Sequence, residues 1–470
     1  MTTKRYDTIV IGAGMSGLAA GIRLAQFDRR VLILERHALW GGLNSFYTKA
    51  GRPFDVGLHA LTNYVPPRTK GAPLTKILRQ LRIRHEELQL GPHRQSELVF
   101  PGVRLKFTND FSFFESEVER EFPAQMDGFQ RIVELVKGHE LREDNVTDVS
   151  ARAVLAEHIS DPLLIEFLML PICFYGSARE DDCDWNQFAI LFQSILLEGL
   201  SRPEGGIRPV LNLLIKRYRG LGGEVRTRSG VAQIKTDAGR VVGVVLDSGE
   251  ELECDTLLSS AGWVETARMV DDANVGASID PGDIGRLSFV ESISVLDRMA
   301  GTLGFDCATS FYCLEDRLRY RRPEALIDVN SGVLSCPENF EAQRPQKEGM
   351  VRQTVLAHHD KWKALKDQGP EVYGAAKAKA SADAIAATRS IYSDWNPHTI
   401  FRDVFTPTTV VDYTGHIDGS IYGSPAKRMT GKTPIEGLVL CGTDQGYLGV
   451  VGAMLSGIAM ANRHALVPSA

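Results

Sequence analysis

The sequence predicts an α/β protein with two domains, one built on a parallel sheet and one that mixes helices with antiparallel sheet. Three observations predict this fold class: an apolar run that meets closely spaced glycines near residue 12, alternating apolar and polar residues over 222–262, and a mostly helical pattern over 110–200. With 470 residues, the chain exceeds the length at which a single hydrophobic core usually stops growing. Two domains that share an interface are therefore expected.

The segment 7–35 predicts a strand, a turn, a helix and a second strand. Apolar runs place the strands at 8–11 and 31–34, and a helical pattern between them continues to about Phe27. Glu35 ends the second strand, where its carboxylate can accept hydrogen bonds from the two hydroxyls of an adenosine ribose and would repel a 2′-phosphate. The unit therefore predicts a Rossmann-like domain for a dinucleotide other than NADP.

Three glycines between the first strand and the helix have the G-x-G-x-x-G spacing of a dinucleotide site. Gly12 allows the tight turn, Gly14 lets a pyrophosphate approach the backbone, and Gly17 lets the helix pack on the strand. The phosphates would lie at the helix N-terminus, beside Met15 and Ser16. Because strand, helix, second strand and carboxylate all fall in register, the alternative of a chance glycine-rich turn is disfavoured.

Composition and charge exclude several other classes of protein. The chain has 43% hydrophobic and 24% charged residues and a net charge of −6, with no dense run of Lys and Arg, so nucleic acid is not an expected partner. The seven cysteines are scattered and include no C-x-x-C pair, which predicts reduced thiols in a cytoplasmic protein and no metal site or redox dithiol. The longest apolar run, 162–175, is too short to cross a bilayer.

The residues that follow Glu35 resemble a flavoprotein pattern. Arg36 precedes Trp40-Gly41-Gly42-Leu43-Asn44, which is similar to the segment in which a second glycine pair, here ending at Gly42, approaches the pyrophosphate of FAD. Members of that pattern often carry Arg or Lys directly after the glycines. This chain has Leu43 there, which leaves a direct side-chain contact to the pyrophosphate open, although Leu43 and Asn44 remain candidates for binding FAD.

A second segment, Phe54-Asp55-Val56-Gly57-Leu58-His59, resembles the Phe-Asp-x-Gly stretch that leads towards the flavin ring in the same proteins. His59 is accordingly the best candidate for a residue at the flavin and for a catalytic residue. An isolated histidine is also often structural, and both interpretations stay open.

Two later segments complete the resemblance. Over 222–262 the sequence predicts a β-meander, which resembles the part of FAD proteins where a strand backbone, here near Val231, meets the adenine and a returning strand, 256–261, leads to Gly262. Near the C-terminus, a buried strand ends at Gly442-Thr443-Asp444 and a helix of small residues follows. The resemblance implies that Asp444 contacts the ribityl or phosphate part of FAD and that the helix N-terminus, at Val451 and Gly452, stabilises negative charge on the reduced flavin. An ordinary antiparallel sheet and simple close packing of the helix are the alternatives.

Together with Pro203-Glu204-Gly205-Gly206, these segments resemble the phytoene desaturase, carotenoid isomerase and retinol saturase superfamily of FAD-dependent oxidoreductases. The resemblance implies a GR2-type FAD-binding domain made of 1–74, 203–265 and 426–470. It leaves 75–202 and 266–425 for a mixed helical and antiparallel-sheet domain that binds substrate, with its helical part near 110–200.

The same resemblance implies an enzyme in which FAD acts on C–C or C=C bonds of a carotenoid or another polyisoprenoid lipid. Aromatic side chains over 110–200 could line an apolar tunnel for it or form an ordinary core, and the apolar run 163–170 could rest on a membrane surface. Because no second G-x-G-x-x-G follows a strand, a quinone, oxygen or another protein is the expected electron partner. Reduction of a polyene double bond, as in retinol saturase, oxidation of an amine, and lipid binding without catalysis remain the alternatives.

Overall fold

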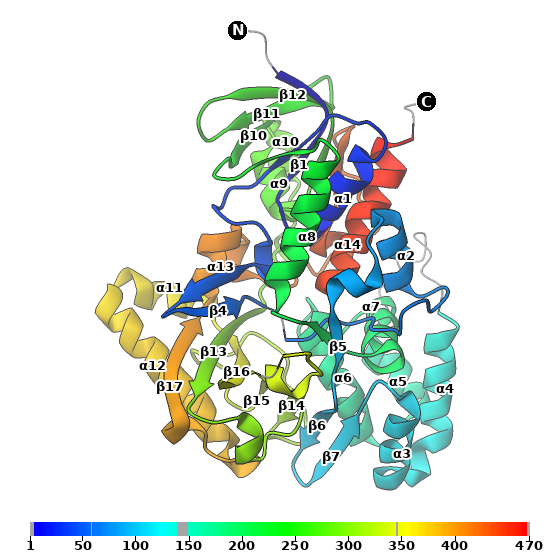
Figure 1. Cartoon of the computed structure of the whole chain (residues 1–470), viewed down its shortest axis with the longest axis vertical. Helices are drawn as coiled ribbons and strands as arrows, with labels where there is room; N and C mark the ends of the chain where they lie inside the picture. Colours follow the sequence, from blue (N-terminus) through cyan, green and yellow to red (C-terminus); the bar gives the residue numbers. More distant parts are fainter. Residues whose placement is uncertain (1–3, 58, 140–148, 345, 468–470) are drawn as a thin grey trace.

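The computed structural model describes residues 4–57, 59–139, 149–344 and 346–467, arranged around two seven-stranded sheets (Figure 1). In the first sheet the strand order is β10-β11-β12-β1-β2-β9, and β18 pairs with residues 257–259 of β12, beyond the part of β12 that pairs with β11. Its strands are β1 (Lys4–Ile11), β2 (Val31–Leu34), β9 (Glu224–Arg226), β10 (Val231–Asp237), β11 (Arg240–Leu246), β12 (Glu251–Ser259) and β18 (Leu438–Leu440). The pairs β12–β1, β1–β2, β2–β9 and β12–β18 are parallel, whereas β10, β11 and β12 form the predicted meander.

Helices cover both faces of this sheet because alternate side chains of its buried strands point to opposite sides. On the face of Val10 and Ile33 lie α1 (Met15–Ala25), α2 (Pro73–Leu81), α8 (Ile207–Gly220) and α14 (Gly449–Met460). On the face of Ile9 and Leu32 lie α9 (Trp263–Met269) and α10 (Ala273–Ala277). The first and last of these segments in the chain, α1 and α14, lie side by side (Figure 1).

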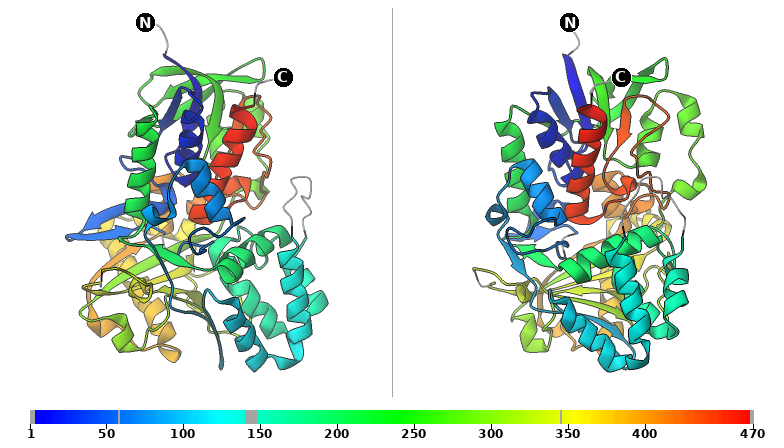
Figure 2. Two further views of the ribbon diagram at one scale, coloured as in Figure 1. Left: turned by 45° about the vertical axis from the view of Figure 1, so that its right-hand side comes forward. Right: turned by 90° about the vertical axis from the view of Figure 1, so that its right-hand side faces the viewer.

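The second sheet has the order β17-β13-β16-β15-β14-β6-β7. Its strands are β6 (Ser96–Phe100), β7 (Val103–Phe107), β13 (Ser288–Leu296), β14 (Thr309–Cys313), β15 (Ser331–Ser335), β16 (Gly349–Ala357) and β17 (Thr399–Phe405). On one face, α11 (His359–Asp367) and α12 (Pro370–Ala387) contribute to the core. The other face meets a group of helices that stands beside the sheet in Figure 2, namely α3 (Phe111–Glu121), α4 (Met126–Lys137), α5 (Ala151–His158), α6 (Pro162–Gly176) and α7 (Trp185–Phe192).

Shorter elements connect the two sheets. The hairpin of β3 (Phe46–Lys49) and β4 (Arg52–Asp55) contacts the second sheet, and β5 (Leu90–Pro92) pairs with β8 (Ser201–Pro203). The last helix of this region, α13 (Pro407–Thr414), follows β17. The predicted combination of a parallel sheet with a mixed helical and antiparallel domain is therefore confirmed.

Two of the predicted domain boundaries fall inside helices. The boundary at 74 cuts α2, whose buried Leu74, Ile77 and Leu81 pack in the same core as α1 and α14. The boundary at 265 cuts α9, which packs on the first sheet. The structure thus places both helices with the first sheet, because their apolar faces have their partners there.

The apolar run 163–170 lies in α6, and its side chains from Leu164 to Leu170, except the half-buried Ile165, are buried in the protein core. The apolar surface of this run is therefore mostly covered by protein, which leaves little of it to rest on a membrane. Within the described ranges, no helix is both long and apolar enough to cross a bilayer. All seven cysteines are buried and unpaired, in agreement with the predicted reduced thiols.

The aromatic side chains of the helical group form a packed core for the most part. Phe114, Phe167, Phe188 and Phe192 are fully buried and make ring contacts with one another or with further aromatic side chains. Phe113, by contrast, is exposed. The ordinary core that the sequence left as an alternative describes these residues. Its rings contact the second sheet at Phe100 and Phe107, and the end of α6 contacts the sheet at Phe174 and Tyr175.

Candidate functional site

The predicted phosphate turn closes tightly between β1 and α1. Gly12 has a φ of +97°, and a Cβ added to Gly17 would lie 2.0 Å from the carbonyl oxygen of Gly12. Gly14 differs, since no protein atom lies within 4 Å of a Cβ added there. Its backbone pairs with Gly41, and a Cβ on Gly42 would lie 3.8 Å from the Cα of Gly14. Gly14 thus faces the pair Gly41-Gly42. The backbone of these residues is left exposed on the side where a pyrophosphate can approach.

The start of α1 is also where the distant chain segments meet. Met15 and Ser16 are buried in its first turn, and a Cβ on Gly442 would lie 2.9 Å from the Oγ of Ser16. The N–H of Gly442 donates to the Oγ of Ser456 in α14 at 2.7 Å. Ser260, just after β12, donates its hydroxyl to the carbonyl of Ile11 at 2.8 Å. Residues near 15, 260 and 442 are therefore brought together around one helix N-terminus.

The predicted ribose and adenine residues lie next to this turn. The Glu35 carboxylate accepts the N–H of Ala13 at 2.9 Å and that of His37 at 2.8 Å, so it also stabilises the turn. The N–H of Ser229 donates to the carbonyl of Glu35 at 2.9 Å, which places the start of β10, at Val231, close to Glu35. Arg36 lies against this strand, because a Cβ on Gly230 would be 3.0 Å from its Cγ.

Asp444 is 2% exposed and joins three segments of the chain. Its carboxylate accepts the N–H of Trp263 at 2.6 Å and that of Ser424 at 2.8 Å. Gly262, which directly precedes Trp263, has a φ of +95°, and a Cβ there would lie 3.3 Å from the Asp444 carboxylate. Each oxygen of Asp444 thus already accepts a backbone hydrogen bond, and its predicted contact with the ribityl or phosphate part of FAD would use the remaining lone pairs.

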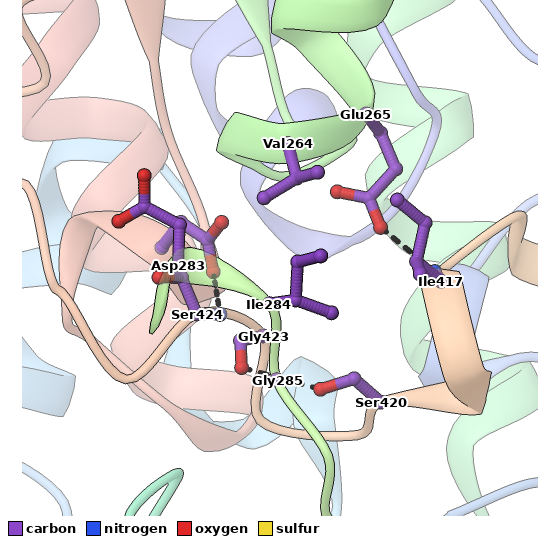
Figure 3. Close-up of a pocket in the computed structure, with 10 residues that line it drawn as sticks. Val264, Glu265, Asp283, Ile284, Gly285, Ile417, Ser420, Gly423 and Ser424 are labelled. Atoms are coloured by element: carbon purple, nitrogen blue, oxygen red, sulfur yellow. Dashed lines mark hydrogen bonds between the residues drawn. The ribbon is translucent and has the colours of Figure 1, made fainter. Parts of the chain in front are cut away.

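Beside Asp444 lies a cavity of about 10 Å³, enough for about one water molecule (Figure 3). It is bounded by α9 and by segments 283–285 and 417–424, with Glu265 and Asp283 on different sides. Glu265 accepts the N–H of Ile417 at 2.9 Å and lies 3.5 Å from Nδ1 of His416. This volume is far too small for a dinucleotide or a lipid. The cavity therefore lies among the residues that support the site and is not itself the binding site for either ligand.

The pair of His416 and Glu265 makes the free energy of unfolding depend on pH in a predictable way. Burial opposes both charges, but the hydrogen bond and attraction between the two groups leave the pKa of Glu265 lowered and the pKa of His416 raised. The Glu265 contribution to the free energy of unfolding is present above pH 4.5 and is lost as the pH falls through its lowered pKa. The His416 contribution is complete below pH 6.5 and is lost as the pH rises through its raised pKa.

We therefore expect the free energy of unfolding to decrease above pH 6.5, and His416→Gln to remove that part of the slope. Urea unfolding of both proteins between pH 5.5 and 8.5 measures it. His398→Gln is the matched control, because His398 contacts Asp297 at the surface, where such pairs contribute little. Equal pH slopes for wild type and His416→Gln would contradict the assigned pairing.

The predicted flavin side of the site lies at the start of α14. A Cβ on Gly449 would lie 3.8 Å from the Oγ1 of Thr62, and Val451 and Gly452 follow in the first turn of the helix. The segment that leads to Thr62 begins near Leu43, because a Cβ on Gly57 would lie 2.5 Å from the Leu43 carbonyl oxygen. Asn44 neighbours Leu43 in a short helix, 42–44. Residues 43–44, Gly57, 59–62 and 449–452 therefore form one region.

Two buried ion pairs hold the chain segment that carries His59. Arg202 donates to the Asp55 carboxylate and, at 3.3 Å, to the carbonyl of His59. Arg352 donates to Glu291 at 2.6 Å and to the carbonyl of Asp55 at 3.1 Å. Both arginines reach the segment between β4 and His59 from different elements, Arg202 from β8 and Arg352 from β16. They fix the backbone that carries His59.

His59 itself is neutral at physiological pH. Its Nε2 lies 3.2 Å from the Oγ1 of Thr354 in a hydrogen bond, and its buried Nδ1 has no hydrogen-bond partner among the described residues. Burial, with the charges of Arg352 and Arg202, holds the pKa of His59 well below 6.5. The side chain is therefore an uncharged ring with one buried nitrogen that has no partner among the described residues.

The face of the second sheet below His59 changes from charged to apolar. Paired residues run across the strands from Glu291 in β13 to Thr354 in β16, Val333 in β15 and Phe311 in β14. Phe311 contacts the ring of Tyr175 at 5.5 Å between centroids. Beyond Thr354 the row is thus apolar and meets the end of α6, and Val333 and Phe311 are buried there in the core shared with the helical group.

The sequence did not reveal Arg202, Glu291 or Arg352 as residues of the site. Arg202 directly precedes the Pro203-Glu204-Gly205-Gly206 segment, which is the only local signal that could have singled it out. Glu291 and Arg352 lie on almost entirely buried strands in a region without a recognisable motif. Their pairing depends on the register between β13 and β16, which the sequence alone does not fix.

Comparison with known proteins agrees with this geometry. A family described as flavin containing amine oxidoreductase matches residues 15–265, more than half of the chain. The phytoene desaturase of Neurospora crassa is 29% identical over 404 residues, which cover 76% of this chain and 66% of that protein. The chloroplastic prolycopene isomerase of Arabidopsis thaliana is 24% identical over 504 residues, which cover 97% of this chain and 82% of that protein.

Solved structures share the whole fold. An oxidoreductase from Methanosarcina mazei superimposes with a TM-score of 0.67 at 17% identity, covering 97% of this chain and all of that one. A putrescine oxidase bound to putrescine gives a TM-score of 0.60 at 16% identity, covering 98% of this chain and 99% of that one. At this level of identity the structures show the common architecture, and the chemistry has to be argued from the site.

Proposed function

This chain belongs to the flavin-containing amine oxidoreductase family and uses FAD, and we propose that it acts on the C–C or C=C bonds of a carotenoid or another polyisoprenoid lipid. The observation that supports this substrate most strongly is the apolar row of the second sheet, which begins at Thr354 beside a neutral His59 and ends at Phe311. Relatives named phytoene desaturase and prolycopene isomerase support the same class of substrate.

We propose that FAD lies along the region where the three segments of the first sheet meet. The exposed backbone around Gly14 suits its pyrophosphate, and Glu35 suits its adenosine ribose. The start of α14 suits the pyrimidine edge of the flavin ring, where a helix N-terminus stabilises negative charge. The residues proposed to contact FAD are Gly12, Gly14, Met15, Ser16, Gly17, Glu35, Arg36, Gly42, Leu43, Asn44, His59, Val231, Gly262, Asp444, Val451 and Gly452.

When bound, FAD supplies a two-electron acceptor or donor at carbon, which the side chains of this protein do not provide. The protein orients the substrate and excludes water. The apolar part of the sheet beyond Thr354 keeps charged groups away from the hydrocarbon, and the two ion pairs fix the position of His59. Because its ring is uncharged, His59 adds no full charge beside an apolar chain, and its Nδ1 can form one hydrogen bond or hold one proton there.

We further propose a quinone or oxygen as the electron acceptor. The sequence has one glycine-rich dinucleotide turn, at Gly12 to Gly17, and we propose that FAD occupies it. A small acceptor that reaches the flavin directly needs no second nucleotide domain. Desaturation and isomerisation both fit this arrangement.

Anaerobic flavin absorbance tests the proposal. We expect the purified, FAD-loaded protein to lose its absorbance near 450 nm, about where oxidised flavin absorbs, when phytoene or a related polyene precursor in liposomes is added. Retinol and simple amines are the comparison substrates. A decrease with amines alone would contradict the lipid substrate, and a protein that binds no FAD would contradict the cofactor assignment. An isomerase would instead convert a cis polyene without net loss of absorbance, which chromatography of the lipid detects.

A further inference from the structure

The loop before β18 places a lysine inside the molecule. The Nζ of Lys427 donates to the carbonyl oxygen of Tyr422 at 2.5 Å. Its side chain as a whole is half-buried, while its ammonium is largely desolvated by the surrounding protein. Tyr422 lies between the second sheet and α6. Its ring packs against Phe289 of the sheet, and its hydroxyl donates to the carbonyl of Phe174 in α6.

The charge of Lys427 is not matched by an ion pair within the described part of the chain. Asp444 is the carboxylate that acts on it, at longer range, and the two oxygens of Asp444 already accept the N–H groups of Trp263 and Ser424. Burial lowers the pKa of Lys427 to about 8 although Asp444 and Cys183 partly offset the effect, and Arg179 adds a further positive charge nearby. At pH 7 the amine is therefore still mostly protonated, and an enclosed ammonium of this kind is costly without an anionic partner.

A second source of positive potential lies beside this lysine. A Cβ added to Gly446 would lie 3.6 Å from the Cβ of Lys427, and Gly446 leads within three residues into α14. The N-terminus of this 12-residue helix carries the positive end of its dipole. The backbone of Lys427 thus lies beside the segment that leads into the positive end of this helix, and positive potential from both sources favours a ligand that carries negative charge.

We propose that Lys427 is the cationic partner of the negative charge that FAD acquires on reduction, and that it raises the reduction potential of the flavin. This inference rests on the proposed function, because it requires the flavin ring at the start of α14. Uptake of two electrons and one proton converts the neutral oxidised ring into a reduced ring with one negative charge. An ammonium in an environment of low polarity stabilises the second form over the first.

The midpoint potential of the FAD-loaded protein measures this effect. We expect Lys427→Met to lower the two-electron potential at pH 7 by about 30 mV or more, which corresponds to a tenfold loss in the preference for reduced over oxidised FAD. Lys427→Arg keeps the charge and should stay close to wild type. Lys432→Met, at an exposed lysine of the same loop, is the matched control and should leave the potential unchanged. In wild type alone, the potential should fall additionally above about pH 8, as the amine loses its proton.

An unchanged potential in Lys427→Met would overturn the proposal. If that variant does not retain FAD, labelling of the wild type decides instead: acetic anhydride should modify Lys427 less readily in the reduced than in the oxidised FAD-loaded protein, because the negative flavin holds the amine protonated. Equal reactivity in both states would also overturn it. Failure of the wild type to bind FAD would contradict the proposed function itself, which is a separate result.

Discussion

Gly14→Ala is expected to weaken FAD binding by about tenfold to a hundredfold while leaving the FAD-free protein as stable as wild type. No protein atom lies within 4 Å of a Cβ at this position, and the φ of Gly14 is −75°, which alanine adopts without strain. The open space is where the pyrophosphate is proposed to lie. An extra methyl group in a packed contact costs about 1–3 kcal/mol, and about 1.4 kcal/mol corresponds to a tenfold change in affinity.

Gly17→Ala separates this effect from damage to the fold. Its Cβ would lie 2.0 Å from the backbone oxygen of Gly12, so the turn itself must shift. We expect Gly17→Ala to destabilise even the FAD-free protein, by about 1–3 kcal/mol. Titration with FAD measures the affinity of each variant. Urea unfolding of the FAD-free proteins measures their stability. If Gly14→Ala bound FAD as tightly as wild type, the pyrophosphate would not approach this backbone.

The second large effect concerns the buried pair of Arg352 and Glu291. Arg352 is 1% exposed and Glu291 is 7% exposed, and their side chains lie within hydrogen-bond distance. Arg352→Met should lower the free energy of unfolding by about 3–5 kcal/mol, because it leaves the carboxylate of Glu291 buried without its partner. Urea unfolding of the FAD-free protein measures the loss.

The double variant Arg352→Met/Glu291→Leu tests the reason for this loss. Replacing both charges with apolar side chains of similar size removes the uncompensated carboxylate, so most of the stability should return. His59 should nevertheless remain less well fixed, since the bond from Arg352 to the carbonyl of Asp55 is also lost. A double variant as unstable as Arg352→Met would show that this bond, rather than the charge, carries the effect.

The sequence predicted the first sheet well because its signals are local. The apolar run of β2 was placed at its observed bounds, Val31–Leu34, and the predicted meander has Asp-x-Gly sequences, which favour turns, at both of its turns, 237–239 and 247–249. Helix α1 ends at Ala25 rather than near Phe27, whose side chain is 49% exposed and therefore gains little from continuing the helix. Such ends depend on packing that periodicity does not record.

The substrate side could not be predicted to the same depth. Asp55 and Arg202 are 147 positions apart, and Glu291 and Arg352 are 61 positions apart. Their contacts arise only when the second sheet and the β3–β4 hairpin are assembled, and charged residues inside strands look like any solvent-facing position in a sequence. Aromatic composition had the same weakness, since it could not distinguish the wall of a tunnel from the core that Phe114 and Phe188 form.

The meeting of α1 with α14 also sets when the protein can acquire its cofactor during synthesis. The glycine turn and Glu35 leave the ribosome early, but Gly442 and the helix that contacts Ser16 are more than 400 positions later in the chain. At about 5–20 residues per second, this gap lasts on the order of 20–90 s. During that time the apolar side of α1 lacks the cover that α14 provides in the finished fold. FAD capture is therefore expected to be a late, post-translational event, and the nascent chain is a natural client for chaperones.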